Sequence, residues 1–406
     1  MNTPVKLRGW RERALAVMPV GSSTNSKAPT LLPEEPEVIV AGSGCRVRDD
    51  RGREFIDFRC ALGPVTLGYR DARVDAAIRA QLDDGILFGH PHPLETTTAE
   101  LFCSLVTGAE AARFLKTGGE ALAAVVRVAR AHTGRDHVVQ IGYNGWLNSL
   151  APGARVLPGA AADAIPGVPA ALAALHHAVD WDDRDELTRL FDAYGADIAV
   201  VLVAADYPSI PDAAGFYRYL RELTTRHGAL LAYDEIVTGF RIALGGIAET
   251  TGVIPDLSVF GKGIANGMPL SVYCGRRDVL SVLDRGEVVV TSTHGGETLS
   301  LAAATATMKA MRDEPILERL HVSGARLRDG MNALFAEARM DIRLVGHPAC
   351  PQFTGDEALV QEFFRAAFRN GLSFYRVVYV NAAHTDLDID ETLQRVGTAL
   401  HETGIS

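Results

Sequence analysis

The sequence has few cysteines, and their arrangement disfavours two kinds of structure. Among 406 residues there are five cysteines, and none of them belongs to a CxxC pair. They are spread along the chain as Cys45, Cys60, Cys103, Cys274 and Cys350. A disulfide framework needs an even set of cysteines, and a structural zinc site needs closely spaced ligands. We therefore expect the reduced thiols of a cytoplasmic protein, and we assign no metal site.

The sequence also lacks an excess of basic residues and a long apolar run. There are 40 Lys and Arg against 50 Asp and Glu, so the formal net charge is -10 at pH 7. This charge disfavours nucleic acid and anionic membranes as the main partner. No apolar run reaches the ~18 residues that a membrane helix needs, and the N-terminus lacks the apolar core of a secretion signal. We expect no nucleic acid and no membrane as partner.

The middle of the chain contains short apolar runs that alternate with helical segments. These runs are rich in Val, Leu and Ile without strict alternation, which is typical of strands buried on both faces of a parallel sheet. They lie at residues 137–141, 197–203, 229–233, 257–260 and 270–274. Segments with helical spacing, such as 121–132 and 215–227, lie between them. The pattern predicts an α/β fold with a mostly parallel sheet.

The two ends of the chain have a different character. Residues 21–33 are rich in Ser, Thr, Pro and Gly, which is typical of an extended loop. Near the C-terminus, helical patterns give way to strand-like pieces around 342–345 and 374–380, and a closing helix is expected from Asp390. We expect three parts. They are an N-terminal segment (1–45) that contributes to the small domain and the active site, a large ligand-binding domain (46–310), and a smaller α+β domain (311–406).

Lys262 lies between two glycines directly after a buried apolar run, in the sequence FGKGI. Glycine allows the backbone to bend sharply and allows a bulky ring to approach it. A poorly solvated lysine amine at a strand end is suited to Schiff-base chemistry. A lysine in a surface loop can give the same short pattern, so the motif needs support from others.

An acidic pair follows the apolar run 229–232, in the sequence YDEIVTGFR. The carboxyl ends of parallel strands are the places where α/β sheets bind their ligands. A carboxylate at this place, Asp234, can keep a pyridine nitrogen protonated, as a cofactor that serves as an electron sink requires. A helix cap or a structural ion pair is the alternative interpretation, and we expect Arg241 to be the structural partner of a carboxylate.

Three turns rich in glycine or hydroxyl groups accompany these motifs. Residues 113–121 run through Gly118 and Gly119 into a helix, whose N-terminus can bind a phosphate group. The sequence GYNGW places Tyr143 at a strand end, where its ring can stack on a planar group. The sequence TSTHGG at 291–296 offers hydroxyls for a second phosphate contact. An ordinary turn, a core tyrosine and a capped loop are the respective alternatives.

These motifs occur in the order and spacing of one family. The chain resembles the class III aminotransferases, most closely the branch of glutamate-1-semialdehyde aminomutase and its sugar-modifying relatives. The resemblance runs from about Pro19 to the end, and its most specific segments are YDEIVTGFR, FGKGIANGMPLS, KTGGEALAAVVRVARAHTG and NAAHTDLDIDETL. It implies a pyridoxal 5'-phosphate enzyme of fold type I, with a mostly parallel seven-stranded sheet in a large domain and a smaller α+β domain.

The resemblance implies roles for the residues around the cofactor ring. Lys262 would carry the cofactor as a Schiff base and later move the proton. Asp234 would pair with the pyridine nitrogen, and Ile236 would contact the ring from below. Tyr143 would stack above the ring, and Asn144 would lie beside it in the cofactor site.

The resemblance also implies how the phosphate is held and how the protein assembles. Gly118 and Gly119 would form the phosphate cup. Thr293 would reach the phosphate from the neighbouring subunit. We therefore expect a homodimer with both active sites at the shared interface.

The chain departs from the family's usual pattern in three places. Asn144 replaces the usual histidine, and the usual Glu-Pro pair after Val203 is replaced by Ala-Ala-Asp-Tyr-Pro. The N-terminal stretch 25–29 lacks the arginine that binds the substrate carboxylate in glutamate-1-semialdehyde aminomutases, and Lys27 could replace it only as a point charge. These losses favour a neutral, hydroxylated substrate.

The sequence thus predicts an aminotransferase that moves an amino group from a small donor such as glutamate to an aldehyde or ketone. By analogy with enzymes that aminate oxo-sugars, we expect the acceptor to be a sugar or aminoglycoside intermediate of antibiotic biosynthesis. An aminomutase or an epimerase would use the same residues and stays open as an alternative. A protein that binds the cofactor without catalysis is a third possibility, whereas the absence of GxGxxG argues against a dinucleotide fold.

Overall fold

The computed structural model describes residues 9–28, 32–146 and 167–402. Its contacts divide the chain into two compact units. The smaller unit comprises Met1–Asp71 and Leu320–Ser406, and the larger unit comprises Ala72–Arg319. Residues 46–71, which we expected in the large domain, therefore group with the smaller unit. The pairing of β3 (Glu54–Asp57) with β13 (Leu372–Ser373) explains this grouping, because it ties the segment to the C-terminal part of the chain.

The larger unit is built on a seven-stranded sheet in the order β4-β10-β9-β8-β7-β5-β6. β10 pairs antiparallel with β4 and with β9, and all the other pairs are parallel. The strands are β4 (Ala111–Leu115), β5 (His137–Ile141), β6 (His176–Val179), β7 (Ile198–Ala204), β8 (Leu230–Asp234), β9 (Leu257–Phe260) and β10 (Ser271–Gly275). The predicted α/β fold with a mostly parallel seven-stranded sheet is confirmed.

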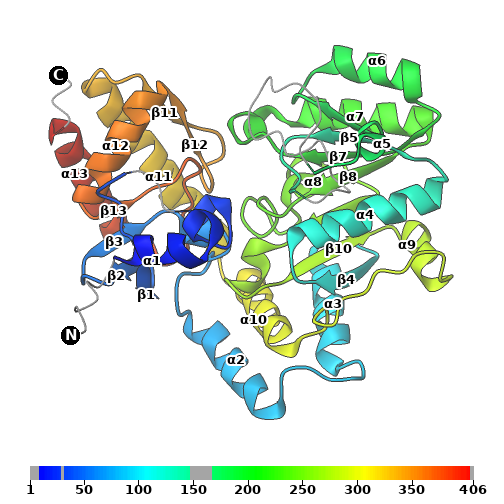
Figure 1. Ribbon diagram of the computed structural model, residues 1–406, viewed down its shortest axis with the longest axis horizontal. Coiled ribbons are helices and arrows are strands. Elements are labelled where there is room, and N and C mark those ends of the chain that lie inside the picture. Colours follow the sequence, from blue (N-terminus) through cyan, green and yellow to red (C-terminus); the bar gives the residue numbers. More distant parts are fainter. Residues whose placement is uncertain (1–8, 29–31, 147–166, 403–406) are drawn as a thin grey trace, which may run out of the picture. The chain divides into compact units, whose positions relative to one another are not determined.

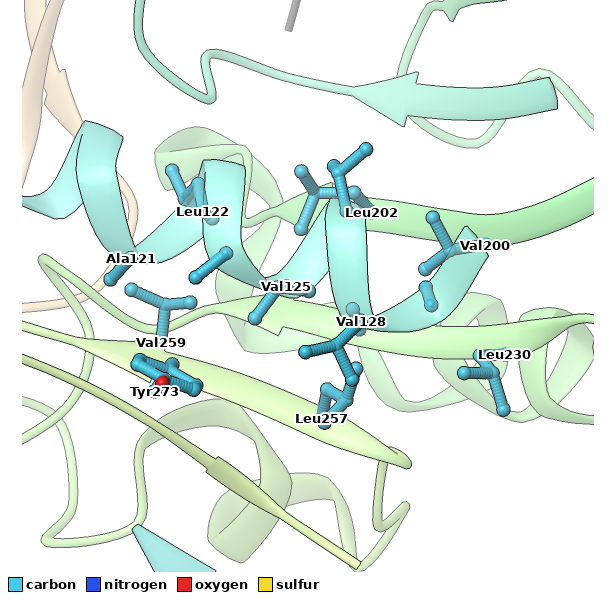
Figure 2. Close-up of a cluster of buried hydrophobic side chains, with 14 of the residues drawn as sticks. Ala121, Leu122, Val125, Val128, Val200, Leu202, Leu230, Leu257, Val259 and Tyr273 are labelled. Carbon is cyan, nitrogen blue, oxygen red and sulfur yellow. The ribbon is translucent and has the colours of Figure 1, made fainter. Parts of the chain in front are cut away.

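Helices cover both faces of this sheet. Ala121, Val125 and Val128 of α4 (Gly118–Thr133) are fully buried in one cluster with strand residues that include Ala232. Figure 2 shows the side chains of α4 facing those of the strands. Tyr217 of α7 (Ala214–His227) instead packs edge-on against Tyr233, with ring centroids 5.0 Å apart. Because consecutive strand residues point to opposite faces, α4 and α7 lie on opposite sides of the sheet.

The other helices of the larger unit can be followed in Figure 1. They are α2 (Ala72–Asp84), α3 (Pro93–Leu105), α5 (Ala170–Ala173), α6 (Arg184–Tyr194), α8 (Gly246–Thr251), α9 (Arg277–Asp284) and α10 (Thr298–Asp313). Short 3-10 turns occupy Tyr207–Asp212 and Lys262–Ala265. α11 (Ile316–Glu337) begins in the larger unit and continues in the smaller one.

The smaller unit has two sheets and a phenylalanine-rich core. One sheet has the order β1-β2-β3-β13, and the other pairs β11 with β12. Their further strands are β1 (Ile39–Ser43), β2 (Arg46–Asp49), β11 (Ile342–Val345) and β12 (Gln352–Gly355), and the helices are α1 (Trp10–Val17), α12 (Glu357–Arg369) and α13 (Asp386–Glu402). Phe335 packs edge-on against Phe363 at 5.1 Å between ring centroids, which illustrates how rings fill this core.

Two local predictions for the smaller unit are wrong. In the described stretch 374–380 there is no strand, and Val377 only forms an isolated bridge with Gln352. α13 begins at Asp386 and not at Asp390, because Thr385 and Asp388 cap each other: the Thr385 N–H donates to Asp388, and the Asp388 N–H donates to the Thr385 hydroxyl. No helix within the described ranges has the length and apolar character to cross a membrane.

Candidate active site

Three of the predicted site residues lie at the carboxyl edge of neighbouring strands in the larger unit. Asp234 is the last residue of β8, Lys262 follows the end of β9, and Asn144 follows the end of β5. These strands run parallel to β7, which lies between β8 and β5. Because parallel strands end at the same edge, their terminal side chains are brought together where α/β sheets bind ligands.

Asp234 is anchored through both carboxylate oxygens. Its Oδ1 accepts a hydrogen bond from the Ile236 N–H at 3.0 Å, and its Oδ2 accepts one from Asn144 Nδ2 at 3.5 Å. Desolvation by the surrounding protein raises the pKa of Asp234 to about 6, although the Ile236 N–H, the charge of Lys262 and the Asn144 amide act to lower it. The carboxylate is therefore mostly ionised at neutral pH and can attract a protonated ring nitrogen.

Lys262 is half-buried and close enough to Asp234 for its charge to stabilise the carboxylate. Its φ of 40° is in the left-handed region, whereas its neighbour Gly261 has extended backbone. The sequence suggested that the flanking glycines provide the sharp bend, but the unusual conformation falls on the lysine itself. A non-glycine residue held there costs about 1–3 kcal/mol, which other contacts must offset.

The N-terminus of α4 can bind an anion. Thr117 and Glu120 form a reciprocal cap, because Glu120 N donates to Thr117 Oγ1 at 3.3 Å and Thr117 N donates to Glu120 Oε2 at 2.8 Å. Within the described residues, no protein group accepts a hydrogen bond from the N–H of Gly118 or Gly119. These two N–H groups and the positive end of the helix dipole are suited to a phosphate.

Ile236 connects this helix end to the acid. A Cβ added to Gly118 would lie 2.3 Å from Ile236 Cδ1, so a larger residue at this position would require the Ile236 side chain or the helix end to shift. The backbone N–H of Ile236 is in turn the donor to Asp234. Ile236 is therefore in contact both with the predicted phosphate cup and with the predicted acid.

The side chains of Tyr143 and Thr293 are more exposed to solvent than those of Asp234, Lys262 and Asn144. The Tyr143 side chain is 57% exposed, and Thr293 is also exposed. Gly142 before Tyr143 has a φ of 75°, and a Cβ there would lie 3.0 Å from the Ala204 carbonyl oxygen. This turn directs the chain past the end of β7. Ring stacking by Tyr143 and a phosphate contact by Thr293 stay predictions.

Two of the three departures from the family's pattern lie near Asp234. Ala204, the last residue of β7, pairs with Asp234 in the sheet register. Asp206 accepts a hydrogen bond from Ser209 Oγ at 2.9 Å. Asn144 is fully buried, and among the described residues its Oδ1 has no hydrogen-bond partner. A buried acceptor of this kind is rare in proteins, and a bound ligand with a donor group would satisfy it.

The sequence interpretation missed the different roles of the two acidic neighbours. Glu235 is fully buried and accepts hydrogen bonds from the N–H groups of Ile247 and Ala248 at 2.9 and 3.1 Å, at the start of α8. Burial raises the pKa of Glu235 to about 7. The helix-cap alternative thus holds for Glu235, while Asp234 faces the site. Glu235 lies just after the end of β8, and its contact with the start of α8 is a tertiary contact that the motif alone does not indicate.

The site contains a half-buried lysine, an acid that can keep a ring nitrogen protonated, and a helix N-terminus suited to an anion. At the carboxyl edge of a mostly parallel seven-stranded sheet, these features define a pyridoxal-phosphate-dependent transferase of fold type I. The family model described as aminotransferase class-III matches residues 33–396. The chain belongs to the class III aminotransferases.

Named relatives agree with this family. The chain is 33% identical to glutamate-1-semialdehyde 2,1-aminomutase of Aquifex aeolicus (strain VF5), with 97% of this chain and 98% of the relative covered. The corresponding protein of Thermomicrobium roseum (strain ATCC 27502 / DSM 5159 / P-2) is also 33% identical, with 96% and 97% covered. Both relatives span nearly the whole chain.

Solved structures agree with the fold. The FumI protein of Sphingopyxis sp. MTA144, solved as its PLP internal aldimine form, has a TM-score of 0.88 at 28% identity, with 97% of this chain and 95% of that chain covered. An omega-transaminase from Sphaerobacter thermophilus has a TM-score of 0.88 at 24% identity, with 97% of each chain covered. The second likeness establishes the fold alone.

Proposed function

We propose that this class III aminotransferase transfers an amino group from an amino donor, with glutamate as the expected donor, to an aldehyde or ketone. The observation that carries the proposal is the electrostatic contact between Lys262 and Asp234, next to the N-terminus of α4. Pyridoxal phosphate, when bound, supplies a protonated ring that withdraws electrons from the substrate carbon. The residues of the chain hold this ring and move the proton.

Lys262 and Asp234 are proposed as the catalytic residues. The Lys262 amine would hold the cofactor and, when released by the substrate, would take a proton from the substrate α-carbon and return it. Asp234 would keep the ring nitrogen protonated. Its carboxylate is ionised above a pKa of about 6, so it can balance the positive ring nitrogen at neutral pH.

The other cofactor contacts fit the shape of the site. The N–H groups of Gly118 and Gly119 would bind the phosphate, and Ile236 would support the ring beside them. Tyr143 would stack on the opposite face of the ring, and its exposed side chain has room to do so. Such fixed anchors keep the cofactor in place while Lys262 is released.

The quaternary structure and location are part of the proposal. The exposure of Thr293 supports a homodimer in which this residue contacts the phosphate of the other subunit. None of the five cysteines forms a disulfide with another described residue, which supports a reducing, cytoplasmic location.

The half-reaction tests the aminotransferase function. Adding an amino donor alone to the cofactor-loaded enzyme should bleach the visible absorbance of the lysine-bound cofactor. Adding the matching carbonyl acceptor should restore it. A Lys262→Ala variant should lack this absorbance from the start. If no amino acid bleaches the wild-type enzyme, the proposal of a two-step transfer is wrong.

An aminomutase is the second candidate, because relatives 33% identical over nearly the whole chain carry that name. Such an enzyme would keep the substrate's own nitrogen within the same molecule. Heavy nitrogen supplied in a free donor distinguishes the two functions. Transfer of the label into the product supports the aminotransferase, and retention of the original nitrogen supports the aminomutase.

We further propose a neutral, hydroxylated carbonyl compound as acceptor, such as a sugar or aminoglycoside intermediate of antibiotic biosynthesis. The small residue Ala204 beside Asp234 supports this, because it removes a charge from the end of β7. Aminated sugars and glutamate 1-semialdehyde should be compared for their ability to change the cofactor spectrum. A change only with the acidic compound would refute this acceptor class.

A further inference from the structure

A buried ion pair lies next to the proposed phosphate cup and has no role in the function described above. Lys116 Nζ lies 2.8 Å from Glu297 Oε2, and the two side chains are only 14% and 11% exposed. Lys116 directly precedes Thr117, the cap residue of α4. Glu297 is the cap residue of α10, and its carboxylate also accepts from Leu299 N at 2.7 Å and from Ser300 Oγ at 2.6 Å.

The pair is one of three anchors on the same short turn. Glu120 Oε2 accepts from Lys116 N at 3.2 Å, and Ser271 Oγ donates to the Thr117 carbonyl at 2.8 Å. Glu297 then fixes the Lys116 side chain. The turn is thereby held by contacts from α4, β10 and the start of α10, while the N–H groups of Gly118 and Gly119 stay available.

The charges of Lys116 and Glu297 are important because the ligand proposed for the phosphate cup is an anion. A phosphate group carries close to two negative charges at neutral pH. An uncompensated carboxylate near it would oppose binding, and this opposition is strong where solvent screening is weak. Lys116 neutralises Glu297, so the carboxylate can cap α10 without repelling the phosphate.

We propose that Lys116 and Glu297 are positioning residues for the phosphate of the cofactor, with Lys116 both fixing the turn and cancelling the charge of Glu297. This inference rests on the proposed role of Gly118 and Gly119 as the phosphate cup. It predicts that the pair affects affinity for phosphate and not affinity for the pyridine ring.

The test compares three ligands on the full-length chain after removal of the cofactor. Pyridoxal phosphate and pyridoxal are titrated by the visible absorbance of the lysine-bound ring, and inorganic phosphate is titrated as a competitor of pyridoxal phosphate. Lys116→Met should raise the Kd for pyridoxal phosphate about tenfold, a change of about 1.4 kcal/mol. The inhibition constant of inorganic phosphate should rise in parallel, and the Kd for pyridoxal should stay within about twofold, or less than ~0.5 kcal/mol.

Matched variants separate the charge effect from a folding defect. Glu297→Gln removes the negative charge and should bind pyridoxal phosphate at least as tightly as the wild type. Lys116→Arg should restore affinity. Lys309→Met, at an exposed position of α10, should leave all three constants unchanged.

The outcomes decide clearly between the alternatives. An equal loss of affinity for pyridoxal phosphate and pyridoxal in Lys116→Met would show a merely structural pair, and unchanged affinity for both would show no role. Weaker binding of pyridoxal phosphate by Glu297→Gln would refute the charge argument. If the wild type forms no visible complex with pyridoxal phosphate, the assignment of Lys262 fails instead, and binding of inorganic phosphate, followed directly by calorimetry, still tests the pair.

Discussion

Asp234 and Glu235 are adjacent carboxylic acids, but their side chains have different surroundings. Burial raises the pKa of both, to about 6 for Asp234 and about 7 for Glu235. Asp234 also faces the positive charge of Lys262, whereas Glu235 is enclosed by backbone N–H groups and the Thr238 hydroxyl. Asp234 is therefore the acid that we propose to act on a ligand, and the difference arises from the surroundings of each side chain and not from residue type.

The Asn144 amide should influence activity through Asp234. It donates to the Asp234 carboxylate and so helps to lower the pKa of Asp234. Asn144→Ala removes this donor, so the pKa of Asp234 should rise further. Because activity requires the ionised form, it is lost as the pH falls through this pKa, and the acidic limb of the kcat profile should move to higher pH. A shift of half a unit would correspond to about 0.7 kcal/mol.

Two controls make this prediction specific. Asn144→His keeps a donor at this position and should move the acidic limb less than Asn144→Ala does. Gln140 in β5 is also a buried amide, but its side-chain oxygen contacts His176. Gln140→Ala should therefore leave the acidic limb of the kcat profile unchanged. An unchanged limb in Asn144→Ala would show that the amide does not act on Asp234.

At the scale of residues, the sequence predicted which side chains lie near one another better than it predicted their backbone conformation. The resemblance pointed to Lys262, Asp234 and Gly118, and the structure brings these residues to one edge of the sheet. It gave no indication that the left-handed backbone would fall on Lys262, because the adjacent glycines were the natural candidates. Backbone angles depend on tertiary contacts that short motifs do not encode.

At the scale of elements, α4 contributes both to the hydrophobic core of the larger unit and to the candidate active site. Its apolar face packs on the sheet, with Val125 and Val128 fully buried, while its first turn contains the N–H groups proposed to bind the phosphate. Burying one such side chain contributes about 1.5–3 kcal/mol, so the position of the helix end is set by the core. The position of the proposed phosphate cup is therefore fixed by packing elsewhere on the helix.

Gly118→Ala should weaken cofactor binding by a steric route. The new Cβ would lie 2.3 Å from Ile236 Cδ1, so either the helix end or Ile236 must shift. We expect the Kd for pyridoxal phosphate to rise at least tenfold, or about 1.4 kcal/mol or more. Ile236→Val removes the clashing atom, so the double variant Gly118→Ala/Ile236→Val should recover most of the affinity. A double variant as weak as Gly118→Ala would contradict this steric coupling.

Some elements could be predicted from sequence and others could not. The apolar runs at 197–203 and 257–260 correspond closely to β7 and β9, because buried parallel strands are nearly continuous in apolar residues. β6 begins with His176 and His177 and so lacks this signal. The direction of β10 was also not predictable, because hydrophobic pattern does not distinguish parallel from antiparallel pairing.

At the scale of the whole molecule, the division of the chain depends on long-range pairing. β3 and β13 are more than 300 positions apart in the numbering, yet they pair within the smaller unit. The sequence contains no sign of the boundary at Asp71, because the pairing of β3 with β13 is not visible in the local sequence. Such boundaries follow from which distant segments bury each other's apolar surface.

Mixed dimers would test whether active sites are shared. Lys262→Ala and Thr293→Glu should each be inactive as homodimers, the first for lack of the amine and the second because a carboxylate repels the phosphate. If Thr293 acts on the other subunit, a mixed dimer contains one intact site. Co-refolding the two variants should then restore up to about a quarter of wild-type activity per total protein, since about half of randomly formed dimers are mixed and each has one working site. No restoration would show that Thr293 acts within its own subunit or has no such role.

The backbone of Lys262 has a consequence for how this protein can change over generations. A left-handed φ of 40° is better tolerated by glycine or asparagine than by lysine. If selection acted on thermal stability alone, glycine or asparagine would therefore be favoured over lysine at position 262. The exchange that would relax the local backbone most is also the one that would remove the amine on which the proposed chemistry depends.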